Sequence, residues 1–424
     1  MGPSHPSPSR TPMPKAPITL NPDRPGAPAL VSRSWHGLRV MDVTKFYAPG
    51  GGGVRTYLDA KIRDFHTRPV THTLVIPGPE HRRELRGSTT VYQLPGVSIP
   101  GTPGYRLLLR ARTLRSIIET EKPDVIEVGS PFLVPLLTQW AAQGRRVSLV
   151  GFYHADLVRT YVDPYVERFG PGLQEWIQVR ARRYVRRVYS GFDATVAASL
   201  SVARELQGLG VPNVRRISLG VDLDLFRPER RTGDLRARLG IGPEVPIALF
   251  AGRLCPEKGL GVVEEAHGRM KAGSRPHLLF VGEGPSAPTF QNLAREREDF
   301  TVLPFVANRE ELARIYASAD LYLATGPGET FGLSVAEAMA SGLPVVAVDS
   351  GAAPDRVQGS GAGELYVRGD AESARMALER MVRRLNPELG RRARDHAALE
   401  YGWRKNFDAL LELYMALVRK KMAA

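Results

Sequence analysis

The sequence predicts an α/β protein with two doubly wound, Rossmann-like domains that face each other across a cleft. Short apolar runs rich in β-branched residues alternate with amphipathic stretches, which is typical of parallel sheets covered by helices on both faces. This alternation is interrupted near the middle of the chain and then restarts. The length of 424 residues also exceeds what a single core usually supports, so two domains are expected.

The first half contains six apolar runs with the length and the bounding residues of β-strands. Between them lie stretches of helical period, for example Val54–Phe65, Tyr105–Glu119 and Leu173–Tyr189. The predicted strands are Leu38–Val43, Thr73–Ile76, Asp124–Val128, Val147–Phe152, Asp193–Ala197 and Val214–Ser218.

A connecting stretch, Gly220–Glu244, carries Pro and a cluster of Arg and Glu, and the pattern restarts after it. In open sheets of this type ligands bind beyond the carboxyl ends of the strands, so the segments that follow strands are the candidate sites. The predicted strands of the second half are Pro246–Ala251, His277–Val281, Thr301–Phe305, Leu321–Ala324, Pro344–Val348 and Gly363–Val367.

From this pattern we expect one domain at residues 38–219 and a second at residues 220–402. Residues 403–424 are expected to form a helix that returns to the first domain. Residues 1–37 are rich in Pro, Ser and Arg and lack the apolar core of a signal peptide, which predicts a disordered tail and argues against secretion.

The cellular compartment is indicated by cysteine usage and by hydropathy. The single cysteine, Cys255, excludes an internal disulfide framework and a zinc site built on several cysteines, and it fits a reducing environment. No apolar run approaches the roughly 18 residues of a membrane span. Together these observations predict a cytoplasmic protein.

The net charge of +14 is concentrated in residues 38–219, which carry +11, whereas residues 220–424 are neutral. This asymmetry suggests an anionic partner, such as lipid headgroups on the inner face of a membrane. The alternative is a set of solvated helix faces in an Arg-rich proteome, since Arg outnumbers Lys 49 to 9. The basic residues cluster on two predicted helices: Arg106, Arg110, Arg112 and Arg115 on the first, and Arg182, Arg183, Arg186 and Arg187 on the second.

The segment Gly328–Ala340 follows a predicted strand, and a helix is expected to begin near Phe331. The first turn of a helix presents free N–H groups and a positive dipole end, which suit a diphosphate, and Gly332 permits close approach of a ligand. Glu329 can then accept hydrogen bonds from a sugar, and Glu337, two turns further on, from a ribose. The alternative is an acid at a helix start and a solvated glutamate.

A second candidate segment, Gly252–Gly259, also follows a predicted strand. Arg253 and Lys258 lie five residues apart in it and can converge on phosphate oxygens. They would stabilise a departing nucleoside diphosphate without a metal ion. The alternative is that both are ordinary solvated loop residues.

Two first-half segments also follow strands. The glycine-rich loop that ends in Gly53 and Val54 allows close backbone approach, and a flexible turn is the alternative. His154 comes directly after Val147–Phe152, and a structural histidine is the alternative. Two other patterns carry no functional prediction, namely the Asp-x-Asp sequence Asp222–Asp224 in the connection and the partial dinucleotide fingerprint Gly282–Gly284.

Taken together, these segments resemble the family 4 retaining glycosyltransferases, which have the GT-B fold. The resemblance covers nearly everything after residue 37, and its most specific part is the glutamate pair with the following Ala338–Ala347. It implies that the second domain binds a nucleotide sugar and that the first binds the acceptor. The implied contacts are Arg253 and Lys258 to the diphosphate, Glu329 to the transferred sugar, Glu337 to the ribose, the backbone of Phe331, Gly332 and Leu333 to phosphates and sugar, Val306 beside the base, Gly53 near the diphosphate, and His154 beside the donor sugar.

The resemblance implies a hexosyltransferase of the cell envelope, with His154, Glu329, Arg253 and Lys258 as its catalytic residues. We expect it to move a hexose, with mannose favoured, from a GDP- or UDP-linked donor to a lipid-linked or glycan acceptor, with retention and without a metal or another cofactor. No second carboxylate for double displacement is evident, so front-face attack is expected.

Two other classes of protein fit parts of the sequence. A nucleotide-sugar epimerase shares the architecture but needs no acceptor, and a nucleic-acid-binding protein would explain the charge, although no recognised binding motif accompanies it. The donor base, the sugar, the acceptor and the oligomeric state are left open by the sequence.

Overall fold

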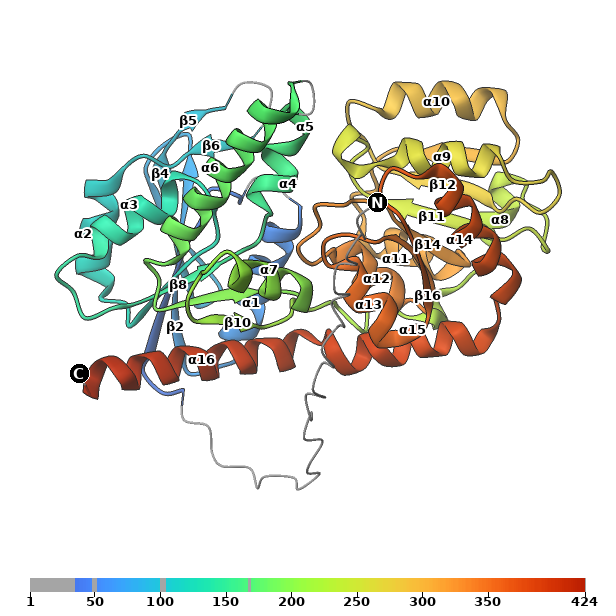
Figure 1. Cartoon of the computed structure of the whole chain (residues 1–424). Helices are drawn as coiled ribbons and strands as arrows, with labels where there is room; N and C mark the ends of the chain where they lie inside the picture. Colours follow the sequence, from blue (N-terminus) through green and yellow to red (C-terminus); the bar gives the residue numbers. More distant parts are fainter. Residues whose placement is uncertain (1–34, 48–51, 100–103, 167–168, 424) are drawn as a thin grey trace, which may run out of the picture. The chain divides into compact units, whose positions relative to one another are not determined.

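The computed structural model describes residues 35–47, 52–99, 104–166 and 169–423, and Figure 1 shows their arrangement. The predicted tail, residues 1–37, lies outside these ranges except for its last three residues. Two sheets carry almost all of the strands, and helices cover both faces of each sheet. None of the described helices is both long and apolar enough to cross a bilayer.

The first sheet has eight strands, and every pair of neighbours is parallel except the hairpin at one edge. Its central strands are buried, because helices cover both of its faces. From one edge to the other the order is β10 (Val214–Arg216), β9 (Ala194–Ala197), β8 (Ser148–Phe152), β7 (Val125–Val128), β1 (Leu38–Val43), β2 (Val70–Gly78), β4 (Thr89–Pro95) and β3 (Arg82–Arg86).

One helix of the first half differs from its prediction. The helix expected at Tyr105–Glu119 begins only at Ala111, because Arg106 and Leu107 form β6 (Arg106–Leu107), which pairs with β5 (Val97–Ser98). The helices of this half are α1 (Gly53–His66), α2 (Ala111–Glu121), α3 (Leu133–Ala142), α4 (Leu157–Tyr161), α5 (Asp163–Val166), α6 (Pro171–Tyr189) and α7 (Leu200–Gly208).

The second sheet has six strands, and all of its pairings are parallel. In chain order the strands take the positions 3-2-1-4-5-6, which is the arrangement of a dinucleotide-binding Rossmann sheet. The order reverses between β11 and its neighbour β14, where this architecture places its ligand. The strands are β13 (Phe300–Leu303), β12 (His277–Val281), β11 (Ile247–Ala251), β14 (Leu321–Ala324), β15 (Val345–Val348) and β16 (Gly363–Tyr366).

Helices connect these strands and cover the second sheet, and the last helix of the chain runs alongside the first half (Figure 1). The predicted fold class, an α/β protein with two doubly wound parallel sheets, is therefore confirmed. The helices are α8 (Asp234–Leu239), α9 (Leu260–Gly268), α10 (Ala287–Glu296), α11 (Arg309–Ser318), α12 (Leu333–Ala340), α13 (Ala353–Ser360), α14 (Ala371–Arg384), α15 (Pro387–Glu400) and α16 (Trp403–Ala423), with short 3-10 turns at Pro228–Arg230 and Pro256–Lys258.

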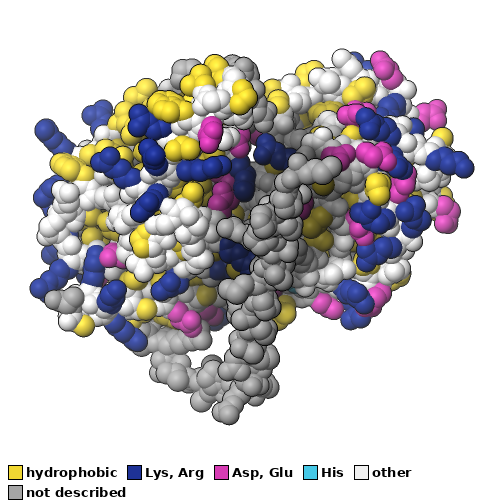
Figure 2. Space-filling model, viewed as in Figure 1, with side chains coloured by type: hydrophobic (Ala, Val, Ile, Leu, Met, Phe, Trp, Pro, Cys, Tyr) yellow, Lys and Arg dark blue, Asp and Glu magenta, His cyan; other side chains and the backbone are white. Residues whose placement is uncertain are grey.

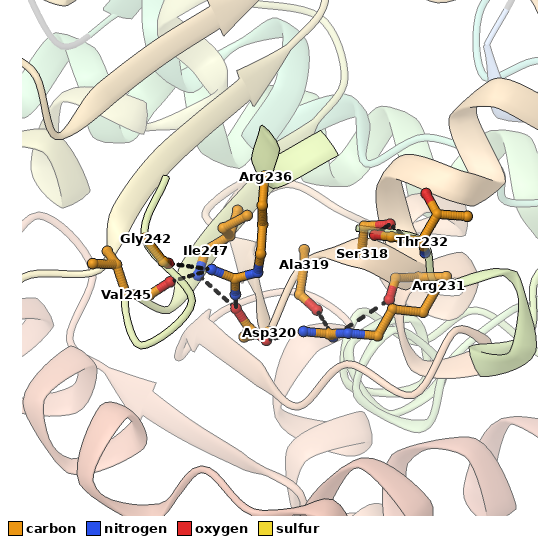
Figure 3. Close-up of polar contacts among 10 residues, drawn as sticks. Arg231, Thr232, Arg236, Gly242, Val245, Ile247, Ser318, Ala319 and Asp320 are labelled. Carbon is orange, nitrogen blue, oxygen red and sulfur yellow. Dashed lines mark hydrogen bonds and ion pairs between the residues drawn. The ribbon is translucent and has the colours of Figure 1, made fainter. Parts of the chain in front are cut away.

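The connecting stretch is fixed to the second sheet at Asp320, directly before β14 (Figure 3). The Asp320 carboxylate accepts hydrogen bonds from Arg231, from Arg236 and, at 2.8 Å, from the backbone N–H of Ile247. Arg236 also donates to the carbonyl of Val245 at 2.7 Å. One carboxylate thus joins the connecting stretch to the first residues of both central strands.

Helix α16 closes a fully buried polar cluster against the first sheet. The ammonium of Lys61, on α1, donates to Asp42 of β1 at 2.9 Å and to the hydroxyl of Tyr414 at 3.0 Å, and it lies 3.3 Å from Glu127 of β7. The hydroxyls of Tyr414 and Tyr57 both donate to Glu127. A buried charge is tolerated when it is paired in this way, so the cluster links α1, β1 and β7 to the last helix.

Candidate functional site

The loops after β11 and β14 meet at the point where the strand order of the second sheet reverses. There the Lys258 ammonium donates to the Glu329 carboxylate, and the Thr325 hydroxyl donates to the Lys258 carbonyl. Burial alone would raise the pKa of Glu329, but Lys258 outweighs burial and holds it below its ordinary value. The reciprocal attraction keeps the pKa of Lys258 above its ordinary value despite burial. Both groups are therefore charged near neutral pH.

The Glu329 loop is held by the segment that follows β15. The Glu329 carbonyl accepts a hydrogen bond from Ala352 at 2.8 Å, and the Pro327 carbonyl accepts one from the Ser350 hydroxyl at 2.9 Å. Gly351 has φ +62°, and a Cβ there would lie 2.6 Å from the Glu329 carbonyl oxygen, so glycine is required. The loop ends at Gly332, whose φ of +74° lets α12 begin at the next residue.

A buried guanidinium supports the same loop, and sequence reasoning missed it. Arg356 on α13 lies 4.3 Å from the ring centre of Phe331 and donates to the Ala352 carbonyl at 2.8 Å. Burial lowers its pKa from the ordinary arginine value. The ring centre of Tyr401 lies 5.4 Å from the guanidinium, and Tyr401 also contacts Phe331 edge to face. No sequence signal marks this residue, because its aromatic partners come from separate segments.

The second glutamate of the motif, Glu337, faces a different cation. It is buried on α12 and lies 2.9 Å from the guanidinium of Arg309, at the start of α11. Burial raises the pKa of Glu337 and outweighs the opposing effect of Arg309. Arg309 was not predicted, and Val306, the residue expected beside the base, is half-buried three positions before it. The acid with the raised pKa is therefore the one expected to bind the ribose.

Arg253 does not join the pair of Lys258 and Glu329. Its side chain is 64% exposed and forms an ion pair with Glu257. The position of its loop is nevertheless well defined, because the backbone of Leu254 accepts and donates hydrogen bonds with the segment after β12. Any role of Arg253 on a phosphate requires its guanidinium to leave Glu257.

The glycines of the sequence Gly282–Gly284, a partial dinucleotide fingerprint, have a structural explanation. A Cβ on Gly282 would collide with the carbonyl oxygen of Gly252, and one on Gly284 with that of Leu254. Both glycines have positive φ, at +146° and +151°. They let the loop that carries Arg253 lie directly against the neighbouring loop.

His154 of the first half lies against the Glu329 segment. Its carbonyl accepts a hydrogen bond from the Thr330 hydroxyl at 2.7 Å, and its ring stacks on Phe152 at 4.0 Å. Burial lowers the pKa of the imidazole to about 3, so it is neutral at physiological pH. It can therefore exchange hydrogen bonds with a ligand but carries no charge.

Gly53, the first residue of α1, is a second point at which the first half meets this segment. A Cβ on Gly53 would lie 3.1 Å from Cδ1 of Leu333. The rest of the glycine-rich loop, residues 48–51, lies outside the described residues. The structure thus brings together Lys258 with Glu329, His154 with Thr330 and Gly53 with Leu333, whereas Arg253 lies on Glu257 and Glu337 on Arg309.

This arrangement can bind an anion next to a polyol. The N–H groups of Leu333 and Ser334 in the first turn of α12 have no intrahelical acceptor. Glu329, which pairs with the Lys258 ammonium, lies beside the start of this helix, since a Cβ on Gly332 would be 4.0 Å from Cβ of Glu329. Within the described residues no group of three or more His, Cys, Asp or Glu is placed to hold a metal ion. Asp222 of the Asp-x-Asp sequence accepts a hydrogen bond from the backbone of Leu225 at 2.9 Å, which is a turn contact.

Comparison with protein families matches both halves of the chain. Residues 51–225 match the family described as glycosyltransferase family 4, and residues 245–384 match the one described as glycosyl transferases group 1.

Related sequences include mannosyltransferases and another glycosyltransferase. A GDP-mannose-dependent alpha-(1-6)-phosphatidylinositol dimannoside mannosyltransferase of Mycobacterium tuberculosis is 30% identical over 75% of this chain and 84% of its own length. A GDP-mannose-dependent alpha-mannosyltransferase of Mycolicibacterium smegmatis is 28% identical over 91% and 99%. A D-inositol 3-phosphate glycosyltransferase of Saccharomonospora viridis is 36% identical over 50% and 51%.

Solved structures share the fold. Sucrose-phosphate synthase of Thermosynechococcus elongatus superposes with a TM-score of 0.71 at 18% identity, covering 90% of this chain and all of that one. WaaG, a glycosyltransferase involved in lipopolysaccharide biosynthesis, superposes with a TM-score of 0.64 at 15% identity, covering 88% and 98%. At such identities the likeness shows the GT-B architecture alone.

Proposed function

This chain belongs to the family 4 glycosyltransferases, which use nucleotide sugars, and we propose that it transfers mannose from GDP-mannose to a lipid-linked acceptor with retention. The related mannosyltransferases support the choice of donor and of a phosphoinositol-type acceptor. The observation that carries the proposal is the charged pair of Lys258 and Glu329 beside the start of α12. That pair offers a cation for a diphosphate and a carboxylate for sugar hydroxyls at adjacent positions.

In this proposal the donor lies with its diphosphate on the first turn of α12. The N–H groups of that turn and the Lys258 ammonium bind the phosphate oxygens and stabilise the charge that develops as the C1–O bond to phosphate breaks. Glu329 accepts hydrogen bonds from mannose hydroxyls and so fixes the sugar above the turn. Glu337 binds the ribose hydroxyls, and Arg309 keeps the Glu337 carboxylate in place before the nucleotide binds.

The acceptor hydroxyl attacks C1 from the face that the phosphate leaves. Its oxygen forms the new bond to C1, and its proton passes to the departing phosphate oxygen, so configuration is retained and no metal ion takes part. The neutral imidazole of His154 exchanges a hydrogen bond with the sugar without adding charge near the developing cation. The enzyme contributes position and electrostatics.

The proposed acceptor brings the protein to an anionic membrane surface, and helix α6 has the corresponding character. Its arginines are exposed, and the described residues provide no ion-pair partner for any of them, whereas each arginine of α14 is paired with a glutamate. Figure 2 shows the same contrast, with basic side chains standing mostly apart from acidic ones over the first half. The arginines of α6 are Arg180, Arg182, Arg183, Arg186 and Arg187.

An Arg-rich proteome by itself would leave both helices alike, so the contrast favours an anionic partner for α6. Leu173 and Trp176, near the start of α6, are 49% and 56% exposed. Exposed apolar side chains beside unpaired basic ones are the combination with which a helix lies on a lipid surface. We place the protein on the cytoplasmic face of the membrane, held there by α6.

The transfer proposal is tested with purified protein, GDP-mannose and phosphatidylinositol mannosides in mixed micelles. Glu329→Gln and Lys258→Ala should each lower kcat at least about 100-fold, because each removes a group that acts on the reacting sugar phosphate. Glu372→Gln, in an exposed ion pair of α14, is the matched control and should keep full activity. Full activity of both site variants would overturn the assignment.

The same preparation separates the two other functions considered. Isomerised nucleotide sugar formed from the donor alone would identify an epimerase, and salt-sensitive retardation of DNA would identify a nucleic-acid-binding protein. UDP-glucose in place of GDP-mannose checks the base and the sugar. A larger thermal shift with the UDP-sugar would exclude GDP-mannose as the donor.

A further inference from the structure

Lys45 stands at the place in the first sheet where a ligand is expected. It is the second residue after β1, and its backbone N–H donates to the hydroxyl of Ser130 at 3.0 Å. Ser130 follows β7, the neighbour of β1. The order of the first sheet reverses between these two strands, as that of the second does between β11 and β14.

The side chain of Lys45 is buried without a counter-charge. Lys45 is 9% exposed, and within the described residues its ammonium forms no ion pair or hydrogen bond. Its neighbours are two aromatic rings, with Nζ 3.8 Å from the ring centre of Phe132 and 5.1 Å from that of Phe46. Burial lowers the pKa of Lys45 to about 8, so the group is still protonated near neutral pH.

Lys61, which is completely buried, shows what a purely structural role requires. Lys61 has two carboxylates, Asp42 and Glu127, and the hydroxyl of Tyr414 within 3.3 Å. A buried ammonium without such partners destabilises the fold unless something else supplies the negative charge. Lys45 lacks such partners, and an anionic ligand would supply the missing negative charge.

Lys45 is not completely enclosed, since 9% of its surface is exposed. Thr44, the residue before Lys45, lies beside Gly129 together with His154. A Cβ on Gly129 would be 3.1 Å from the His154 ring and 3.6 Å from the Thr44 hydroxyl, next to Lys45. The end of β1, after which Lys45 follows, therefore lies next to the residue proposed beside the donor sugar.

We propose that Lys45 binds the phosphoryl group of the acceptor, with the rings of Phe46 and Phe132 holding the ammonium in place. This inference rests on the proposed function, since it names the chemistry of the second substrate. One N–H of the ammonium donates to a phosphate oxygen in a charge-assisted hydrogen bond. The rings attract the ammonium and keep the side chain in one position in the absence of ligand.

The test measures thermal unfolding of the full chain and of Lys45→Met and Lys45→Arg, with myo-inositol 1-phosphate, glycerophosphoinositol, myo-inositol or GDP-mannose. At least one of the two phosphate probes, myo-inositol 1-phosphate and glycerophosphoinositol, should raise Tm of the wild type and of Lys45→Arg but not of Lys45→Met. A shift with myo-inositol 1-phosphate alone indicates a soluble phosphorylated acceptor. A shift with glycerophosphoinositol, whether or not the monoester shifts Tm too, indicates a lipid headgroup. GDP-mannose should raise Tm of all three equally, and myo-inositol of none.

Stability provides a readout that a structural lysine would not give. Without ligand, Lys45→Met should unfold at a higher temperature than the wild type, because it removes an unpaired buried charge. In the transfer assay its KM for a phosphate-bearing acceptor should rise about tenfold or more, whereas hydrolysis of GDP-mannose without acceptor is unchanged. Lys45→Gln is the second neutral variant, should Lys45→Met not fold.

Three outcomes overturn the proposal. They are the absence of a shift by either phosphate probe in the wild type, equal shifts in the wild type and Lys45→Met, and loss of the GDP-mannose shift in Lys45→Met, which would assign the lysine to the donor. Failure of the proposed function gives a different result. The wild type then neither binds GDP-mannose nor transfers mannose, while the phosphate probes still raise Tm of the wild type but not of Lys45→Met.

Discussion

At the scale of single residues, the two glutamates of the motif differ in the cation that each one faces. Glu329 has the ammonium of Lys258 and is ionised, whereas burial raises the pKa of Glu337 in spite of Arg309. Ribose hydroxyls donate more strongly to a carboxylate than to a carboxylic acid. Nucleotide binding should therefore depend on the pH range in which Glu337 titrates.

Arg309→Met removes the only cation that the described residues place in an ion pair with Glu337, so the pKa of Glu337 should rise further. Affinity for GDP should then begin to fall at a higher pH than in the wild type as the solution is acidified. Titration calorimetry across a pH series measures this shift. Arg314→Met, on an exposed arginine of the same helix, is the control. Identical pH profiles for wild type and Arg309→Met would contradict the prediction.

Glu127 in the buried cluster predicts a pH dependence of stability. Burial raises its pKa to about 7, above the value of about 4.5 expected in the unfolded chain. Between these values the folded state binds more protons, so this group makes the free energy of unfolding fall as pH rises. Glu127→Gln should lose less stability than the wild type between pH 5 and pH 8, by about 1 kcal/mol or more, in urea unfolding. Equal losses would contradict this assignment.

Some site residues could be predicted from the sequence and others could not. Lys258 and Glu329 each follow a parallel strand, and strand ends of one sheet lie at one edge, so their proximity follows from local pattern. Arg309, Arg356 and Lys45 depend on partners that are distant in the sequence. Their positions required the three-dimensional arrangement.

At the scale of elements, the loops after β11 and β12 depend on two glycines. Gly282→Ala should lower the free energy of unfolding by about 2 kcal/mol or more, because a Cβ collides with the backbone of Gly252 and neither loop can move freely. Gly261→Ala in α9 is the matched control, since a Cβ there meets nothing within 4 Å. It should stabilise by up to about 1 kcal/mol. Chemical denaturation measures the free energy of unfolding of both variants, and similar changes in the two would contradict the prediction.

The strands that the sequence did not reveal are the hairpin of β3 and β4 at one edge of the first sheet and the separate pair of β5 and β6. Strand β3 is mostly charged and exposed, as is usual for an edge strand that must not pair with another molecule, so it shows no apolar run. It forms a hairpin with β4. The helix predicted from Tyr105 was placed too early because Arg106 and Leu107 continue its period but pair with β5. Central strands, by contrast, are mostly apolar and buried, and were recognised.

At the scale of the whole molecule, the lateral order of the strands could not be predicted from the sequence pattern. Apolar runs indicate which segments are strands, but every permutation of parallel strands has the same local pattern. Within the order 3-2-1-4-5-6 of the second sheet, the pairing of β11 with β14 is supported by Asp320, directly before β14, which accepts hydrogen bonds from Ile247 at the start of β11 and from Arg236. Those contacts join residues more than seventy positions apart.

The unequal pairing of arginines predicts where the protein meets a membrane. Replacing Arg180, Arg182, Arg183 and Arg187 of α6 with Gln should abolish co-sedimentation with vesicles containing phosphatidylinositol. The same change to Arg375, Arg380, Arg383 and Arg384 of α14 removes an equal charge and should leave binding intact. Neutral vesicles should bind neither the wild type nor the variants. Equal loss in both sets would mean that only net charge matters.

The position of Tyr414 has a consequence for synthesis of the chain on the ribosome. This tyrosine lies 353 residues after Lys61, the partner to which it is hydrogen-bonded. At a synthesis rate of roughly 5–20 residues per second, about 20–70 s pass between the translation of the two residues. During that time Lys61 and Glu127 lack their hydrogen bonds to Tyr414, because α16 has not yet been made. The sheet that is translated first is therefore the one whose interior is completed last.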